Sequence, residues 1–277
     1  MRAQTSAVSL IERFRERAGA AGGRVGAVIL GPGGRAVLAL DPDSVYPAAS
    51  VIKLPLVMTL YADAHEGRLS LDERVAVGER VDGSGVLRDL RDVSELSLRD
   101  LAALAITVSD NTATNRLIER VGIERVTARL DEWGCPRTRL RRRTFDWEAR
   151  SRGLENEMVP RETASLLARV DRGAADGVAA SVAVLDLLRR NANVTRLGRY
   201  LPADVGLAHK DGWGDDPDPV ENDAGIVAGR PSVVVVGFTH RVPTLEARPL
   251  LGLLGLAAAE VAGVAVPALP LEALAGS

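Results

Sequence analysis

Strand-like segments at both ends of the chain, with helical segments between them, are the feature that most restricts the fold. Near the N-terminus, residues 24–30 and 35–40 are β-like runs joined by the glycine-rich turn 31–34, a hairpin signature. Three further β-like runs lie near the other end: residues 205–210, 223–227 and 232–239. The pattern predicts a sheet assembled from both termini.

The middle of the chain carries helical patterns. Residues 50–65 are apolar nearly all round, which is typical of a buried helix. Other predicted helices cover residues 9–17, 98–107 with Ser97 as N-cap, 114–120, 124–132 and 160–170. We therefore expect one domain over 1–277, with a sheet lobe of residues 1–47 plus 195–277 and a helical lobe of residues 48–194.

Composition excludes several classes of protein. Hydrophobic residues make up 46% and charged residues 26%, as in ordinary globular proteins. A net charge of −2 gives no reason to expect nucleic acid or an anionic membrane as partner. A single cysteine excludes an internal disulfide, and with three histidines a zinc site or a Ser-His-Asp triad is disfavoured.

The two ends of the chain bear on localisation. The first 22 residues mix charged and apolar side chains and lack the apolar core of a secretory signal. We expect a cytoplasmic protein, or a mature form whose leader was removed. Residues 249–271 are almost uncharged, but Glu260 lies at their centre and Pro267 and Pro270 break their end, which favours a helix packed on the sheet over a membrane span.

Lys53 and Lys210 are the only lysines among 35 basic residues. A desolvated lysine can lose its proton and act as a base, whereas arginine keeps its charge. Ser50 lies three residues before Lys53, so that on a helix its hydroxyl and the amine share one face. A serine and a lysine in this arrangement can act as a nucleophile and its general base. The alternative is an N-capping serine beside an unrelated lysine.

Two more short elements carry polar groups. Ser109-Asp110-Asn111 follows a predicted apolar helix, and it suits either proton relay and amide binding or a simple Asx helix cap. Lys210-Asp211-Gly212 lies on a β-like run, where an edge strand presents a cation and backbone N–H groups to a cleft. The alternative for this element is a charged turn with a surface lysine.

Together the three elements resemble the signature set of class A β-lactamases and penicillin-binding proteins. The segments Tyr46-Pro47-Ala48-Ala49-Ser50 and Asn222-Asp223-Ala224-Gly225-Ile226-Val227 are also similar to the class A-related serine hydrolases. The resemblance spans nearly the whole chain. It implies an α+β fold of the β-lactamase/transpeptidase type, an α/β sandwich with an antiparallel sheet flanked by helices and an inserted all-helical lobe.

The resemblance also implies site residues. Ser50 is then the nucleophile, Lys53 its base, Ser109 the proton relay to the leaving group, and Lys210 the source of positive potential. Backbone N–H groups of Ser50 and Trp213 form the oxyanion hole, and Asn111, Asp211 and Gly212 contact the substrate. A small-molecule amide, ester or β-lactam is the expected substrate, and no metal or organic cofactor is required.

One departure from the family lies in the loop over residues 140–157. Class A β-lactamases carry a deacylating glutamate there, and counting along this loop puts its place near Thr144 or Phe145. Asp146, Glu148 and Glu155 are candidate deacylation residues only if the loop has shifted. We expect slow deacylation and hence a weak β-lactamase.

The other departure is Asp211, where the family usually has a hydroxyl that binds the β-lactam carboxylate. Its negative charge predicts a neutral or cationic ester or amide as substrate. Five further carboxylates are expected to add negative charge at the mouth of the cleft: Asp215, Asp216, Asp218, Glu221 and Asp223. For the first three of these, the alternative is a solvated acidic loop.

Rival functions are an acylation-only sensor or penicillin-binding protein, a D-alanyl-D-alanine peptidase, and a catalytically silent binding module. Five arginines over residues 137–143 form a strong basic run: Arg137, Arg139, Arg141, Arg142 and Arg143. Because no aromatic platform accompanies them, we expect a loop paired with neighbouring carboxylates rather than a nucleic-acid surface.

Overall fold

A five-stranded antiparallel sheet forms the centre of the computed structural model, which describes residues 6–174, 177–214 and 217–266. Its strands lie in the order β2-β1-β9-β8-β7. Their bounds are β1 (Arg24–Leu30), β2 (Ala36–Leu40), β7 (Leu207–Gly214), β8 (Val220–Val227) and β9 (Val233–His240). β1 pairs with β9, so the two ends of the chain do build one sheet and the predicted α+β fold is confirmed.

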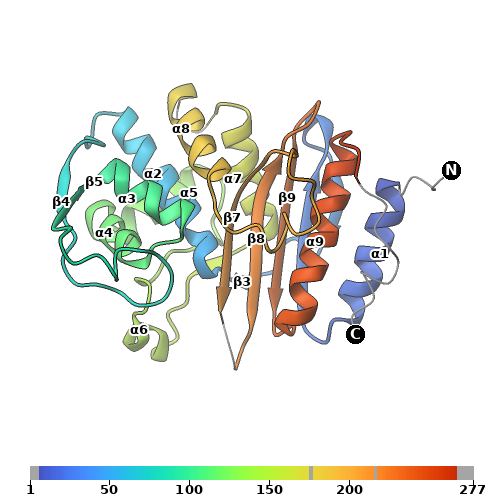
Figure 1. Cartoon of the computed structure of the whole chain (residues 1–277), viewed down its shortest axis with the longest axis horizontal. Helices are drawn as coiled ribbons and strands as arrows, with labels where there is room; N and C mark the ends of the chain where they lie inside the picture. The colour runs from blue at the N-terminus through green and yellow to red at the C-terminus, as the bar shows by residue number, and fades with distance from the viewer. Residues whose placement is uncertain (1–5, 175–176, 215–216, 267–277) are drawn as a thin grey trace.

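Helices lie on both faces of this sheet (Figure 1). On one face α9 packs against β8 and β9, and α1 packs against α9; on the other, α7 lies against β1, β8 and β9 and the remaining helices extend beyond it. The helices are α1 (Ala7–Ala20), α2 (Lys53–His65), α3 (Leu98–Thr107), α4 (Asn111–Val121), α5 (Ile123–Glu132), α6 (Trp147–Ser151), α7 (Pro160–Asp171), α8 (Val178–Arg189) and α9 (Thr244–Val261).

Short elements complete the chain. Two-stranded pairs are formed by β3 (Tyr46–Pro47) with β6 (Glu157–Met158) and by β4 (Arg74–Ala76) with β5 (Glu95–Ser97). Turns of 3-10 helix are η1 (Pro32–Gly34) and η2 (Ala49–Ile52). The β3–β6 pair matters for the site because it holds the segment that leads into Ser50.

Two apolar cores lie on opposite faces of the sheet, and the valine run of β9 supplies both. Val234 and Val236 point into the core shared with the helices around α2, while Val233 and Val235 point into the core under α9. Successive side chains of a strand alternate between faces, so a strand buried on both sides reads as a continuous apolar run. At Gly237 an added Cβ would lie 2.5 Å from Leu251, so this glycine lets α9 approach the sheet closely.

Two elements that carry site residues differ from the sequence-based expectation in a way that matters for the site. The segment expected as one helix over 50–65 begins as the 3-10 turn η2 and becomes α-helical only at Lys53. The strand expected over 205–210 instead runs over 207–214, because its pairing with β8 continues from Leu207 to Gly214. The whole Lys210-Asp211-Gly212 element therefore lies on a strand.

The apolar C-terminal segment forms α9, which packs on the sheet as expected. Pro267 and Pro270 lie outside the described residues. Among the residues that the structure covers, none of the helices has both the length and the apolar character needed to span a membrane.

Candidate active site

Ser50 lies in η2, on the connection from the short β3–β6 pair to the buried helix α2. The backbone N–H of Ala48 donates to the carbonyl of Asn156 at 2.8 Å, which fixes the start of this turn. Ala49 has φ 44°, a left-handed conformation that non-glycine residues adopt at an energetic cost. The half-buried Ser50 therefore directly follows a strained residue, on a turn whose start is fixed by Asn156.

Lys53 is completely buried at the first turn of α2. Its Nζ lies 2.7 Å from the carbonyl oxygen of Ser109, 3.0 Å from Ser109 Oγ and 2.9 Å from Asn111 Oδ1. Burial holds the pKa of Lys53 well below its ordinary value, and the positive charge of Lys210 lowers it further. In all three contacts the Lys53 amine is the donor, and the acceptors are oxygen atoms of Ser109 and Asn111.

Ser109 and Asp110 lie between α3 and α4, Asn111 is the first residue of α4, and Ser109 also has a positive φ, 55°. Asp110 is the N-cap of α4 and accepts the N–H of Ala113 at 2.9 Å, so the alternative role as a helix cap is confirmed for this residue. Its second oxygen accepts the N–H groups of Val86 and Leu87 at 2.7 and 2.8 Å. Asp110 thus fixes the loop over 81–87 beside the site.

Asn111 is nearly buried and links Lys53 to this loop. Its Oδ1 accepts from Lys53, and its Nδ2 donates to the carbonyl of Asp82 at 2.9 Å. An amide nitrogen carries two N–H groups, so the contact with Asp82 uses one of them. The second N–H of Asn111 is not used in this contact.

The edge strand β7 brings Lys210, Gly212 and Trp213 to the same place. A Cβ added at Gly212 would lie 2.5 Å from the backbone nitrogen of Ser50, so the strand touches η2 directly. The carbonyls of His209 and Asp211 accept from Asn191 and Lys210 side chains, which shows that odd-numbered residues point their backbone polar groups away from β8. By strand alternation the N–H of Trp213 points to the same outer edge, next to Ser50.

Asp211 is buried, with four donors around its carboxylate. Arg196 Nη1 and Asn193 Nδ2 each lie 2.8 Å from Oδ2, while Asn191 Nδ2 lies 3.0 Å and Lys210 Nζ 3.2 Å from Oδ1. Burial by itself raises the pKa of Asp211, but Lys210 and Arg196 outweigh it, so that the pKa lies well below its ordinary value. Asp211 is therefore an ionised carboxylate that accepts hydrogen bonds from both cations.

The expected acidic rim of the cleft is wrong for the residues that the structure describes. Glu221 is buried and paired with Arg196 and Arg248, and Asp223 is buried beside His209, at 2.8 Å from its Nδ1. Asp218 is paired with Arg241 at 2.6 Å. These carboxylates are compensated by protein groups rather than facing a ligand, and Asp215 and Asp216 lie outside the described residues.

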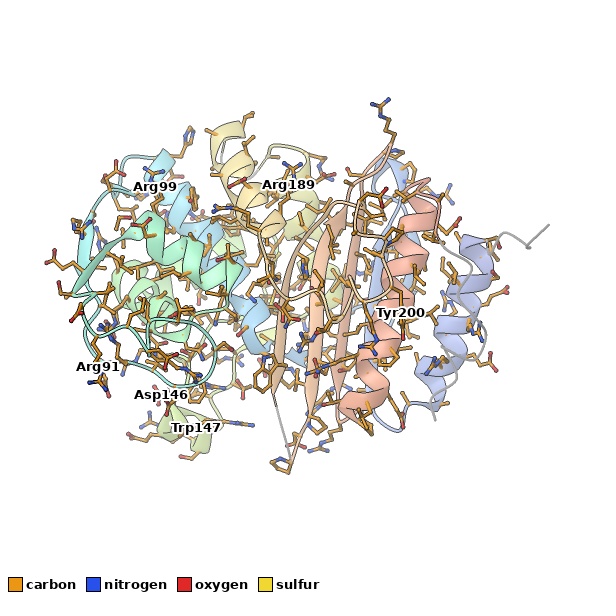
Figure 2. All side chains as sticks on the ribbon, viewed as in Figure 1. Arg91, Arg99, Asp146, Trp147, Arg189 and Tyr200 are labelled. Carbon is orange, nitrogen blue, oxygen red and sulfur yellow. The ribbon has the colours of Figure 1, made fainter. Side chains whose placement is uncertain are left out.

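The three candidate deacylation carboxylates are held by other partners in the 140–157 loop. Asp146 caps α6 by accepting the N–H of Ala149 at 2.9 Å. Glu148 is exposed and paired with Arg152 at 3.0 Å, and Glu155 is paired with Arg142 at 2.6 Å. Figure 2 shows Asp146 at the start of α6, near the rim of the molecule.

Thr144 is the loop residue that contacts the site. Its N–H and hydroxyl each donate to Asn115 Oδ1 at 2.8 Å, and its carbonyl accepts from Asn115 Nδ2 at 3.0 Å. The Thr144 hydroxyl also lies 3.3 Å from the carbonyl oxygen of Asn111. The place that counting assigns to a deacylating glutamate is thus occupied by a threonine that Asn115 holds in position.

The basic run over 137–143 is paired, as expected. Arg137 donates to the carbonyl of Asp43. The other four arginines form ion pairs with nearby carboxylates: Arg139 with Asp131, Arg141 with Glu157, Arg142 with Glu155 and Arg143 with Glu119. In the part of the chain described, no three His, Cys, Asp or Glu side chains gather as a metal site would require.

Arg196 and Asn115 are site residues that the sequence did not single out. One arginine among many carries no signal, and asparagine in a helix carries none either. Both act through contacts across long sequence distances, Arg196 on Asp211 and Glu221, and Asn115 on Thr144.

Comparison with known proteins agrees with this arrangement. Residues 9–262 match the sequence model described as "Beta-lactamase enzyme family". A β-lactamase structure from Sphaerobacter thermophilus is 31% identical, with TM-score 0.81, covering 92% of this chain and 97% of that one. An ancestral class A β-lactamase is 29% identical, with TM-score 0.80, covering 91% and 99%. PBP-A is 26% identical, with TM-score 0.79, covering 90% and 93%.

A curated relative matches over a shorter stretch. It is the β-lactamase regulatory protein BlaB of Streptomyces cacaoi, 30% identical over 100 residues. The match covers 35% of this chain and about a third (32%) of that protein's length.

Proposed function

This chain belongs to the beta-lactamase enzyme family, and on that premise we propose that it is a serine acyl hydrolase that forms an ester with its substrate at Ser50. The observation that carries the proposal is the environment of Lys53. A fully buried lysine with a lowered pKa lies one helical turn after Ser50 and contacts both Ser109 and Asn111. A lysine whose pKa is lowered in this way loses its proton more readily than a surface lysine and can then act as a base.

Acylation begins with proton transfer from the Ser50 hydroxyl to the neutral amine of Lys53. The Ser50 Oγ then bonds to the substrate carbonyl carbon, and the carbonyl oxygen becomes an oxyanion. Backbone N–H groups of Ser50 and Trp213 stabilise this negative charge, which needs donors that are already oriented before the reaction. The contact of Gly212 with the Ser50 nitrogen supports this pairing of the two N–H groups.

Collapse of the intermediate breaks the bond to the leaving group. The Lys53 ammonium passes a proton to Ser109, and the Ser109 hydroxyl gives its own proton to the leaving nitrogen or oxygen. The 3.0 Å contact between Lys53 Nζ and Ser109 Oγ supports this relay. Water then attacks the acyl-serine ester, giving the free acid and restoring Ser50.

Deacylation is the slow step in this proposal. Asp146, Glu148 and Glu155 are engaged elsewhere, and Thr144 has no basic group to activate water. The chain is then a weak β-lactamase, and the second candidate function is acylation without turnover, as in a penicillin-binding or sensor-like protein. The engagement of these three carboxylates favours that alternative, and similarity to PBP-A is consistent with it.

We further propose that the substrate is neutral or cationic next to its scissile bond. Asp211 already binds Lys210 and Arg196, the two buried cations beside it. A substrate carboxylate entering there meets an ionised carboxylate and no uncompensated cation. Penicillins, which carry a carboxylate, are therefore expected to acylate more slowly than neutral esters.

Intact-protein mass spectrometry tests the nucleophile. Wild type and Ser50→Ala are each incubated with penicillin G, a neutral fluorophosphonate and a neutral thioester. We expect a mass increase that is present in wild type and lost in Ser50→Ala. A mass increase of equal size in Ser50→Ala would refute the assignment.

Substitution of Asp211 tests the substrate class. In Asp211→Ser, we expect the acylation rate for penicillin G, relative to the neutral thioester, to rise about tenfold, since a charge-assisted hydrogen bond becomes available. Asp218→Asn removes an exposed carboxylate of the neighbouring segment and should leave the ratio unchanged. An unchanged ratio in folded Asp211→Ser contradicts the role of Asp211.

A further inference from the structure

Three exposed aromatic side chains lie in the segments around the proposed site. The chain has three each of Phe, Trp and Tyr, and Phe145, Trp147 and Trp213 are exposed at 40%, 58% and 45%. The other six are buried or half-buried. Large exposed aromatic rings are costly in water and mark binding surfaces when they gather at one place.

Phe145 lies next to the amide of Asn111. A Cβ added at Gly83 would be 2.6 Å from Phe145 Cζ and 2.7 Å from Asn111 Nδ2. Both atoms therefore crowd the same point on the 81–87 loop. This places the Phe145 ring at the side of the site where Asn111 can hold an acyl amide.

The backbone on both sides of Phe145 is held by hydrogen bonds. Thr144 is held by Asn115 on one side, and Asp146 caps α6 on the other. Phe145 itself has φ 60°, and of the five non-glycine residues with positive φ in the described chain, three are Ala49, Ser109 and Phe145. Backbone strain of this kind collects where function requires a fixed geometry.

Trp147 supports the same ring. Its indole packs edge to face on Phe145, with ring centroids 5.4 Å apart and planes at 77°. The Arg150 guanidinium lies 5.5 Å from the Trp147 centroid. Figure 2 shows Trp147 on α6, beside Asp146. The two rings form one aromatic surface that remains partly exposed to solvent.

We propose that this aromatic wall, defined as Phe145 backed by Trp147, binds the acyl group of the substrate and selects acyl groups that end in an aromatic ring. The inference rests on the proposed acyl transfer to Ser50. A planar apolar group covers the exposed Phe145 face and removes apolar surface from water on both partners. Phe145 is a specificity-determining residue, and Trp147 is a positioning residue that holds its ring.

Matched thioesters test the aromatic wall. Phenylacetyl and acetyl thioesters of N-acetylcysteamine share a neutral leaving group and differ only in the ring. The rate of Ser50 acylation is followed by intact mass, and thiol release by absorbance. We expect wild type to favour the phenylacetyl compound, and Phe145→Gly to reduce that preference by roughly threefold to tenfold, the range of an aromatic pair interaction.

Further variants separate the ring from the backbone. Glycine suits a positive φ, so Phe145→Gly removes the ring without adding strain. Phe145→Tyr keeps the ring and should retain the preference, and Leu154→Ala, which trims another exposed apolar residue of the same loop, should leave it unchanged. Trp147→Leu should lower the preference less than Phe145→Gly does.

The outcomes distinguish this inference from the function on which it rests. Acylation of Ser50 at the same phenylacetyl-to-acetyl ratio in wild type and Phe145→Gly overturns the aromatic wall alone. Failure of both thioesters to acylate Ser50 in wild type contradicts the proposed acyl transfer, and the inference falls with it.

Discussion

A single buried side chain, Lys53, shows how sequence position becomes chemistry. Its three acceptors come from the Ser109-Asp110-Asn111 element, more than 50 residues away, and they replace the water that a surface lysine would have. Removal of water lowers the pKa of the amine, and the nearby charge of Lys210 acts in the same direction. An arginine at this position would stay protonated and could not accept the Ser50 proton.

The pH dependence of acylation follows from this lowered pKa. Below the pKa of Lys53 the side chain is an ammonium and cannot accept a proton, so the acylation rate rises with pH through that pKa and is constant above it. Because the pKa lies well below 10.5, we expect the plateau to be reached at a pH well below that of an ordinary lysine. Rates of labelling by a neutral fluorophosphonate at a series of pH values measure the profile.

Lys53→Arg is the matched variant for this profile. It keeps the positive charge at every pH, so labelling of Ser50 should fall by at least about a hundredfold, the low end of general-base contributions, and lose its pH dependence. Equal profiles in wild type and Lys53→Arg would exclude Lys53 as the base.

Gly212 gives a second prediction for a single residue. Because an added Cβ would lie 2.5 Å from the Ser50 nitrogen, Gly212→Ala should push β7 away from η2 and displace one oxyanion donor. Loss of such a donor lowers the acylation rate by about a hundredfold or more. The acylation rate is measured under single-turnover conditions with the neutral thioester.

Gly214→Ala serves as its control on the same strand. There the nearest atom to an added Cβ, apart from the adjacent residues, is Val220 Cβ at 3.9 Å, an ordinary contact. The acylation rate should stay within about twofold of wild type, because uncrowded surface changes have small effects. Similar losses in the two variants would mean that the crowding at Ser50 is not the cause.

At the scale of elements, the proposed mechanism makes the 140–157 loop the segment that decides between turnover and a stable acyl-enzyme. Its acidic residues cap α6 or pair with arginines, and its contact with the site is made by Thr144 through Asn115 and Asn111. The polar groups of the loop are therefore largely engaged with one another, and none of its carboxylates is among the charged groups that act on Lys53. The edge strand β7 is the complementary element, since its close contact with η2 brings two backbone N–H groups together.

Thr144→Glu should convert slow deacylation into faster turnover. The substitution puts a carboxylate at the position whose side chain contacts Asn111, and a carboxylate that acts as general base contributes about a hundredfold or more. Decay of the acyl-enzyme mass after removal of excess thioester measures the deacylation rate. Acylation itself should change little.

Glu148→Gln tests the opposite possibility in the same loop. Glu148 is exposed and paired with Arg152, so its removal should leave deacylation unchanged. Slower deacylation in Glu148→Gln, with no gain in Thr144→Glu, would show that the loop rearranges and that Glu148 is the base.

At the scale of the whole molecule, a buried charge network joins the edge of the sheet to α9. Arg196 bonds Asp211 on β7 and Glu221 on β8, and Glu221 also bonds Arg248 on α9. His209 and Asp223 lie beside it, and the Asp223 carboxylate accepts the N–H of Leu197. Asp211 and Glu221 are thus paired with cations of the protein itself. The same pairing neutralises Lys210 and Arg196, the cations next to the site.

Arg196→Met should destabilise the fold strongly. It leaves two buried carboxylates short of a cation, and breaking a buried ion pair in this way costs about 3–5 kcal/mol. Urea unfolding followed by circular dichroism measures the free energy of unfolding. Arg161→Gln breaks the exposed pair with Asp43 and should lower the free energy of unfolding far less, because water screens a surface ion pair. Equal losses in the two variants would contradict the importance of the network.

The sequence by itself determined the sheet built from both termini, the buried helix after Ser50 and the three short polar elements. Periodicity, turn residues and spacing are local properties, so strands such as β9 and caps such as Ser97 and Asp110 can be predicted from them. The rarity of lysine likewise pointed to Lys53 and Lys210.

Tertiary structure alone decided the charges and the contacts around the site. Glu221 and Asp223 looked like an acidic rim because their sequence neighbours are acidic, but their partners Arg196, Arg248 and His209 come from other segments. The clamp of Asn115 on Thr144 and the position of Phe145 beside Asn111 are of the same kind. Whether a charge is free or paired depends on which side chains the fold brings within about 4 Å of it. The separation of two residues along the sequence does not predict this.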